Sequence, residues 1–245
     1  MMQTFCPEVI RCKSLFPPGV MKSRPVIVSD RITPMDPRQQ AIRHGQAKKR
    51  NNALAALLCG TIPAALLGLH ATLTWQRWIA GLIVGLIWGN AFEYAYHRWL
   101  LHRPRTSFAS AHHDHHAKIG TPDEAEYVAL ITSPRNIVLL FVINGLPAYL
   151  ISLLFELQGV LSGVFVGWTV YLILCEEFHW RIHLNGWLPP GLHLARAYHL
   201  SHHDIPNSRY NVFLPLFDLV FRSNEDPVLA SLLKRSGSGS RDEIT

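Results

Sequence analysis

The chain has 245 residues, of which 49% are hydrophobic and 16% are charged, whereas roughly 25% of the residues of an ordinary soluble domain are charged. Its formal net charge is +6, but no interleaved basic and aromatic pattern accompanies that excess, which argues against a nucleic-acid partner. The cysteines Cys6, Cys12, Cys59 and Cys175 suggest neither a disulfide framework nor a zinc finger.

Both ends of the chain are predicted to be disordered. Residues 1–50 are rich in proline and show no sustained apolar period. They lack the continuous apolar core of a secretory signal, and we favour a simple tail over a transit peptide. Residues 225–245 are interpreted as a polar C-terminal tail that ends in a stretch rich in serine and glycine.

Between the tails lie four apolar stretches, each close to the ~20 residues that a membrane-spanning helix needs. They are Asn51 to Gln76, Trp78 to Phe92 with a helical continuation through Leu101, Asn136 to Phe155, and Leu157 to Cys175. The alternative is a soluble protein with four buried helices, but core helices rarely lack charge on every face over such lengths. The sequence therefore predicts that 51–224 is an all-α membrane domain with four transmembrane helices.

Basic residues set the expected orientation. Arg43, Lys48, Lys49 and Arg50 precede the first apolar stretch, and such residues favour the cytoplasmic side of a membrane. If the first two spans form one hairpin and the last two form another, the segments 94–135 and 176–245 both lie on that same side. We expect these two segments to form a cytoplasmic helical cap on a multi-pass protein of a bacterial inner membrane or the endoplasmic reticulum.

Histidines are concentrated in these two segments, in four clusters. They are His97 and His102; His112, His113, His115 and His116; His179 and His183; and His199, His202 and His203. Residues at i, i+3 and i+4 share a helix face, so His112, His115 and His116 should project together, as should His199, His202 and His203. His113 lies at the margin of its face and is interpreted as a supporting or incidental residue.

His97 and His102 pose a separate problem, because residues five apart diverge by about 140° on an ideal helix. Pro104 follows them and allows the last turn to be distorted. Our hypothesis is that these two histidines serve two different metal ions. The isolated histidines His44, His70 and His193 are interpreted as non-ligands.

Without His113, ten clustered imidazoles remain, and these are too many for one ion, since zinc takes three or four protein ligands. Two ions with four or five nitrogens each would use the set. Neutral nitrogen ligands suit iron, copper, zinc and nickel. We favour two iron ions, with zinc as the alternative in a purified form.

The order of these motifs resembles that of the fatty acid hydroxylase / sterol desaturase superfamily, which carries His-x4-His, His-x2-His-His, His-x3-His and His-x2-His-His with apolar spans between them. The resemblance extends over about 52–224 and includes the segment from Asn211 to Ser223. It implies a non-haem di-iron oxygenase that uses O2 as co-substrate. Its metal ligands would be the clustered histidines other than His113, ten in all.

The resemblance also implies a reaction and partners. Members hydroxylate or desaturate fatty acyl chains, sphingolipids, sterols, carotenoids or alkanes. We expect a lipid substrate, with a fatty acyl chain, sphingolipid or sterol preferred over a carotenoid because of the segment from Asn211. Electrons should come from a separate donor of the cytochrome b5 or ferredoxin/reductase type.

Carboxylates near the clusters are candidates to accept the second N–H of ligating histidines. Glu93, one turn before His97, and Asp204, directly after His203, are the preferred candidates. Further candidates are Asp114, Glu176, Glu177, Asn207 and Tyr210.

Three other readings of the clusters fare less well. A carboxylate di-iron bundle needs Glu-x-x-His on two helices, and only Glu176 to His179 matches. A zincin protease needs His-Glu-x-x-His, which does not occur. A membrane metal-binding or metal-transport protein is the non-enzyme alternative, but a transporter should hold its ligands near the middle of its spans.

Overall fold

The computed structural model describes residues 35–70, 74–103 and 106–225, and all of the regular secondary structure in them is helical. In chain order the elements are α1 (Pro37–His70), α2 (Trp75–Tyr96), the π-helix η1 (His97–Leu101), α3 (Ser107–Ala117), α4 (Glu124–Tyr127), α5 (Pro134–Leu154), α6 (Gln158–His183), α7 (His193–Asp204) and α8 (Leu216–Val220). The predicted all-α fold is thus confirmed.

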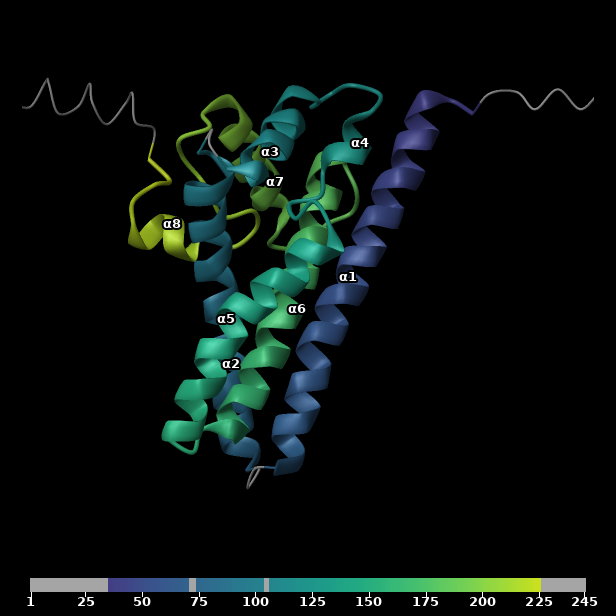
Figure 1. Cartoon of the computed structure of the whole chain (residues 1–245). Helices are drawn as coiled ribbons and strands as arrows, with labels where there is room; N and C mark the ends of the chain where they lie inside the picture. Colours follow the sequence, from purple (N-terminus) through teal and green to yellow (C-terminus); the bar gives the residue numbers. More distant parts are fainter. Residues whose placement is uncertain (1–34, 71–73, 104–105, 226–245) are drawn as a thin grey trace, which may run out of the picture. The chain divides into compact units, whose positions relative to one another are not determined.

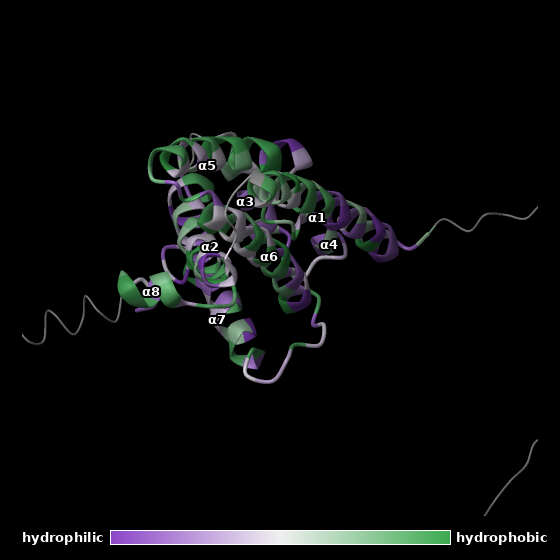
Figure 2. Cartoon of the chain, turned by 90° about the horizontal axis from the view of Figure 1, so that it is seen from below, coloured by the Kyte–Doolittle hydropathy of each residue, from purple (hydrophilic) through white to green (hydrophobic). Residues whose placement is uncertain are grey.

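Among the described residues, four helices are long and apolar enough to cross a membrane, as the sequence predicts. They cover Pro37–Leu69, Trp75–Leu101, Pro134–Leu154 and Gln158–His183. Large apolar side chains such as Ile62, Ile143 and Leu146 are exposed on them. Figure 2 shows hydrophobic residues along α5 and along the inner part of α1, with hydrophilic residues at the outer end of α1. Such outward apolar surface is what lipid would cover.

The helix α6 is the centre of the bundle and packs against α2 along a seam of glycines. A Cβ added to Gly85 of α2 would lie 2.3 Å from the carbonyl oxygen of Val164, and one added to Gly163 of α6 would lie 2.1 Å from that of Trp78. Small residues allow helix backbones in membranes to approach this closely. The seam therefore fixes α2 and α6, whose far ends carry histidines, against each other.

The remaining helices gather at one end of the bundle. Figure 1 shows α3, α4 and α7 beyond the ends of α2 and α6, with α8 beside α2. The C-terminal end of α1, the start of α2 and the loop that joins α5 to α6 lie at the opposite end. We call the first end the histidine end.

The first helix begins earlier than expected. Residues 37–50, assigned to the disordered tail, form the N-terminal part of α1, which corrects that boundary. The reason is contact with the histidine end: Lys48 Nζ donates to the Glu126 carbonyl at 2.8 Å, and Lys49 Nζ to Glu177 Oε2 at 2.5 Å. A helix that is held by charged contacts of this kind has no apolar periodicity by which the sequence could indicate it. The tail predictions for 1–34 and 226–245 lie outside the described residues.

Candidate metal centre

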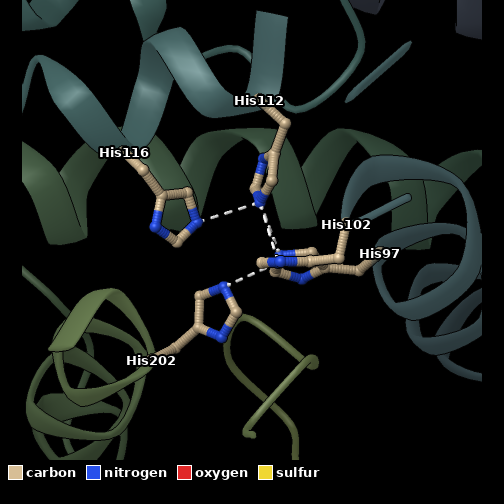
Figure 3. A group of neighbouring side chains, drawn as sticks. All are labelled: His97, His102, His112, His116 and His202. Atoms are coloured by element: carbon tan, nitrogen blue, oxygen red, sulfur yellow. Dashed lines mark hydrogen bonds between the residues drawn. The ribbon is translucent and has the colours of Figure 1, made fainter. Parts of the chain in front are cut away.

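The helical elements of the histidine end gather the ten predicted ligands into two groups of five. Within each group, one ring nitrogen per residue lies within 4.8 Å of all the others. Site 1 contains His97, His102, His112, His116 and His202, and is shown in Figure 3. Site 2 contains His115, His179, His183, His199 and His203.

The two sites share the helices α3 and α7 and divide the His-x2-His-His motif of each between them. On α3, His112 and His116 belong to site 1 and His115 to site 2. On α7, His202 belongs to site 1, and His199 and His203 to site 2. The rings of His116 and His203, from different sites, have centroids 4.2 Å apart. Each His-x2-His-His motif therefore bridges two adjacent sites.

In site 1, the Nε2 atom of His112 is the hub. It lies 3.0 Å from His97 Nε2, 3.1 Å from His102 Nε2 and 3.0 Å from His116 Nε2. A ring nitrogen has one proton or one lone pair, so it cannot make three hydrogen bonds at once. Nitrogens about 3 Å apart are expected when two ligands sit about 2.1 Å from one ion at roughly a right angle. The geometry therefore fits a shared cation.

Site 2 repeats this arrangement around His199. Its Nε2 atom lies 3.0 Å from His179 Nε2, 3.1 Å from His183 Nε2 and 3.2 Å from His203 Nε2. Within the described chain, the buried Nε2 of His115 has no hydrogen-bond partner. A cation would satisfy that nitrogen.

Burial keeps seven of these imidazoles neutral. It lowers the pKa of His102 to about 4 and the pKa values of His116 and His202 to about 3, with neighbouring histidines adding to the effect. The pKa values of His112, His115, His199 and His203 are lowered in the same way. Neutral imidazoles present lone pairs to metals at physiological pH. The donor set thus fits iron, zinc, copper or nickel.

The other ring nitrogens distinguish the two sites. In site 1, His97 Nδ1 contacts the Tyr210 carbonyl, and His202 Nδ1 lies 2.6 Å from the Ser208 carbonyl. In site 2, His183 Nδ1 lies 3.0 Å from the Glu124 carboxylate. An Nδ1–H that donates to such an acceptor leaves Nε2 free to bind a metal.

The structure corrects the hypothesis that His97 and His102 serve different ions, because both belong to site 1. Residues 97–101 form a π-helix rather than the last turn of an α-helix. Its hydrogen bonds join residues five apart, and such segments often occur at functional sites. The wider turn brings the two rings to 5.1 Å between centroids.

The three residues predicted to support the ligands do not contact a ligand ring within the described chain. Glu93 is buried and accepts hydrogen bonds from Tyr171, from the Asn211 side chain and from the Val212 backbone N–H. It therefore acts on site 1 through the chain next to Tyr210. Asp204 and His113 are exposed to solvent.

The other candidates are also placed. Glu176 accepts the backbone N–H of Ile131, and Glu177 pairs with Lys49 and Arg181. Asp114 and Asn207 are exposed. Of the presumed non-ligands, His44 and His193 are exposed and belong to neither site, and the side chain of His70 lies outside the described part.

Sequence reasoning missed Glu124 and the Ser208 carbonyl as partners of ligand histidines. Glu124 lies 59 residues from His183 along the chain, and no motif joins them. Backbone carbonyls carry no signal in a sequence. Tyr210 is among the residues that the sequence offers as supporting candidates, and its backbone carbonyl contacts the ligand His97.

Comparison with known proteins agrees with this geometry. The family model described as fatty acid hydroxylase matches residues 82–223, which include every histidine of both sites. No curated protein and no solved structure matches the chain at a significant level.

Proposed function

Because the chain belongs to the fatty acid hydroxylase family, we propose that it is an O2-dependent oxidoreductase that hydroxylates or desaturates a C–H bond of a lipid at two histidine-held iron ions. The observation that carries the proposal is the pair of five-histidine sites at one end of four candidate spans. A fatty acyl chain, a sphingolipid or a sterol is the proposed substrate, since each reaches such a site from within the membrane.

The ten histidines would hold the ions, five at each site. Two iron ions bound there would supply the redox chemistry that reduces O2 and oxidises an unactivated C–H bond. The carbonyls of Ser208 and Tyr210 and the Glu124 carboxylate would hold three of the rings in the ligating tautomer.

Apolar residues beside the sites would keep water away from the reaction. Leu101 and Ile182 are fully buried, and they adjoin His102 and His183 in the sequence. A dry environment limits side reactions of a strong oxidant with water. The same surroundings suit the hydrocarbon part of a lipid.

Hydroxylation consumes O2, two electrons and two protons, and yields an alcohol and water. A separate electron donor of the cytochrome b5 or ferredoxin/reductase type is therefore part of the proposal. We place the histidine end on the cytoplasmic side, which is supported by Arg43, Lys48, Lys49 and Arg50 at that end of α1.

The test is product analysis in cells that express the chain under 18O2. Wild-type protein should add 18O to a lipid or introduce a double bond, whereas His183→Ala and His202→Ala should not. His44→Ala is the matched control, because His44 belongs to neither site. Unchanged products in the two ligand variants would refute the assignment, and oxidation of added carotenoids alone would replace the proposed substrate class.

Metal analysis of the purified protein tests the centre itself. We expect two ions per chain, with iron in protein isolated under conditions that retain it. One ion or none, unaffected by a His115→Ala/His202→Ala double substitution, would refute the di-metal proposal. Metal flux through the protein in liposomes would favour a transporter instead.

A further inference from the structure

A second ligand site lies within the spans, away from the histidines. A groove of about 1010 Å³ is lined by α1, α5, α6 and the start of α2. Its volume is at the upper end of the ~300–1,000 Å³ range of ligand pockets. Its walls include Pro63 and Leu66 of α1 and Val142 and Leu146 of α5, so the part inside the spans accepts hydrocarbon.

The groove is separated from the metal centre. Phe141 and Phe165 line it, and behind them the Phe141 ring packs on buried Trp168 with centroids 4.3 Å apart. Along α6, Phe165 lies about 21 Å from His179 at 1.5 Å per residue. None of the ten ligand histidines lines the groove, so a molecule bound in it does not contact the metal centre.

The polar residues of the groove lie at its end opposite the histidine end. Arg77 at the start of α2, Glu156 in the α5–α6 loop and Gln158 at the start of α6 line it there. Arg77 and Glu156 are exposed, and neither forms an ion pair with any residue that the structure describes. Within the part of the chain that the structure describes, the mouth thus offers a cation and an anion without ion-pair partners beside an apolar channel.

We propose that this groove binds a phospholipid with an ethanolamine head group, which stays resident and is not oxidised. Arg77 binds the phosphate, Glu156 accepts hydrogen bonds from the ammonium, and the acyl chains lie between α1 and α5. The choice of an ethanolamine head group follows from charge complementarity at the mouth of the groove. A sterol leaves both charges unpaired, phosphatidylglycerol has no ammonium for Glu156, and a choline head group has no N–H to donate.

Native mass spectrometry of the full-length protein in detergent tests the proposal. After delipidation, the protein is titrated with palmitoyl-oleoyl phosphatidylethanolamine, phosphatidylcholine or phosphatidylglycerol. We expect one phosphatidylethanolamine per chain, bound on the order of tenfold more tightly than the other two. Arg77→Gln and Glu156→Gln should each remove that preference, whereas Arg135→Gln, an exposed arginine outside the groove on α5, should not.

A second pair of variants tests the location of the lipid. Leu146 lines the groove and Leu150 does not, although both lie on α5 and are 56% and 53% exposed. Leu146→Trp should fill the groove and reduce binding, and Leu150→Trp should leave it unchanged. Equal effects of the two substitutions, or equal retention of the three lipids, would mean nonspecific annular lipid and overturn the proposal. A preference for phosphatidylglycerol that survives Glu156→Gln would overturn the head-group assignment.

Discussion

The two histidine sites have the same number of rings and draw on the same two cap helices, α3 and α7, yet different groups hold their rings. At site 1, backbone carbonyls of the segment that follows α7 accept from His97 and His202. At site 2, the Glu124 side chain contacts His183. The orientation of His97 and His202 therefore depends on the fold of a loop, whereas that of His183 depends on a charged side chain.

This difference has an electrostatic consequence. A carboxylate that accepts the Nδ1–H of a ligand makes that imidazole a stronger donor to the metal than a neutral carbonyl does. It also adds negative charge beside the cation. We therefore expect site 2 to hold its ion more tightly than site 1 when the protein is treated with a chelator.

The largest expected effect comes from removing the hub of either site. His112→Ala should release the site 1 ion and His199→Ala the site 2 ion, and each should lower turnover by at least about 100-fold. Elemental analysis and product assays measure both effects. The matched controls are exposed neighbours on the same helices, His113→Ala and His193→Ala. Two ions retained in His112→Ala would contradict the division into two sites.

A smaller effect, confined to site 2, should follow from Glu124→Gln. Loss of the charge that orients His183 should weaken metal binding there by roughly 10- to 100-fold, the usual effect of removing a group that orients a metal ligand. Chelator titration with metal analysis measures it. Glu126→Gln on the same short helix is the control, because Glu126 faces His44 rather than a ligand. Equal loss from both sites would show that Glu124 stabilises the cap as a whole.

Glu93→Gln should have the complementary effect at site 1, on the order of tenfold. Glu93 accepts the Val212 N–H and the Asn211 side chain, and so positions the chain beside the Tyr210 carbonyl. The site 2 ion in the same sample is the internal control. If chelation removed the two ions at their wild-type rates, the link through Tyr210 would be wrong.

A further effect, independent of bound metal, is on the stability of the metal-free protein at low pH. The folded-state pKa values of His102, His116 and His202 lie at about 3 to 4, below the ordinary value of 6.5. As pH falls from 6.5 towards 4, the unfolded chain binds protons that the folded chain does not, so the free energy of unfolding should decrease. Above pH 7 the three histidines are neutral in both states, so they should not change the free energy of unfolding.

Thermal unfolding of chelator-treated protein in detergent at several pH values measures this dependence. His202→Ala should make the decrease shallower by at most about 1.4 kcal/mol per pH unit, the contribution of one proton. His193→Ala should leave the slope unchanged. A stability that rises below pH 6 would contradict the sign of the pKa shifts.

The sequence predicted the parts of this molecule that repeat along the chain. Uncharged apolar stretches indicated the four spans, because a helix surrounded by lipid hydrocarbon must be predominantly apolar. The i, i+3, i+4 spacing predicted that His112, His115 and His116 share a face, because a regular helix fixes that relation. It could not show that the face divides between two sites, since the division depends on where α6 and η1 lie.

Three features depend on tertiary contacts and could not be read in advance. The π-helix places His102 with His97, although an α-helix would separate them. Glu124 reaches His183 only because α4 packs near the end of α6. The polar start of α1 is helical because Lys48 and Lys49 find acceptors at the histidine end.

The glycine seam between α2 and α6 bears on how the enzyme tolerates different bilayers. The backbones of α2 and α6 touch at Gly85 and Gly163, so a slide that brought a larger residue to either place would drive its Cβ into a carbonyl oxygen of the neighbouring helix. A thinner or thicker bilayer changes the preferred tilt of a span. Here α2 and α6 must tilt as one body, which leaves His97 and His179 at a constant separation. The chemistry of the centre should therefore be insensitive to membrane thickness, even where the peripheral helix α5 adjusts.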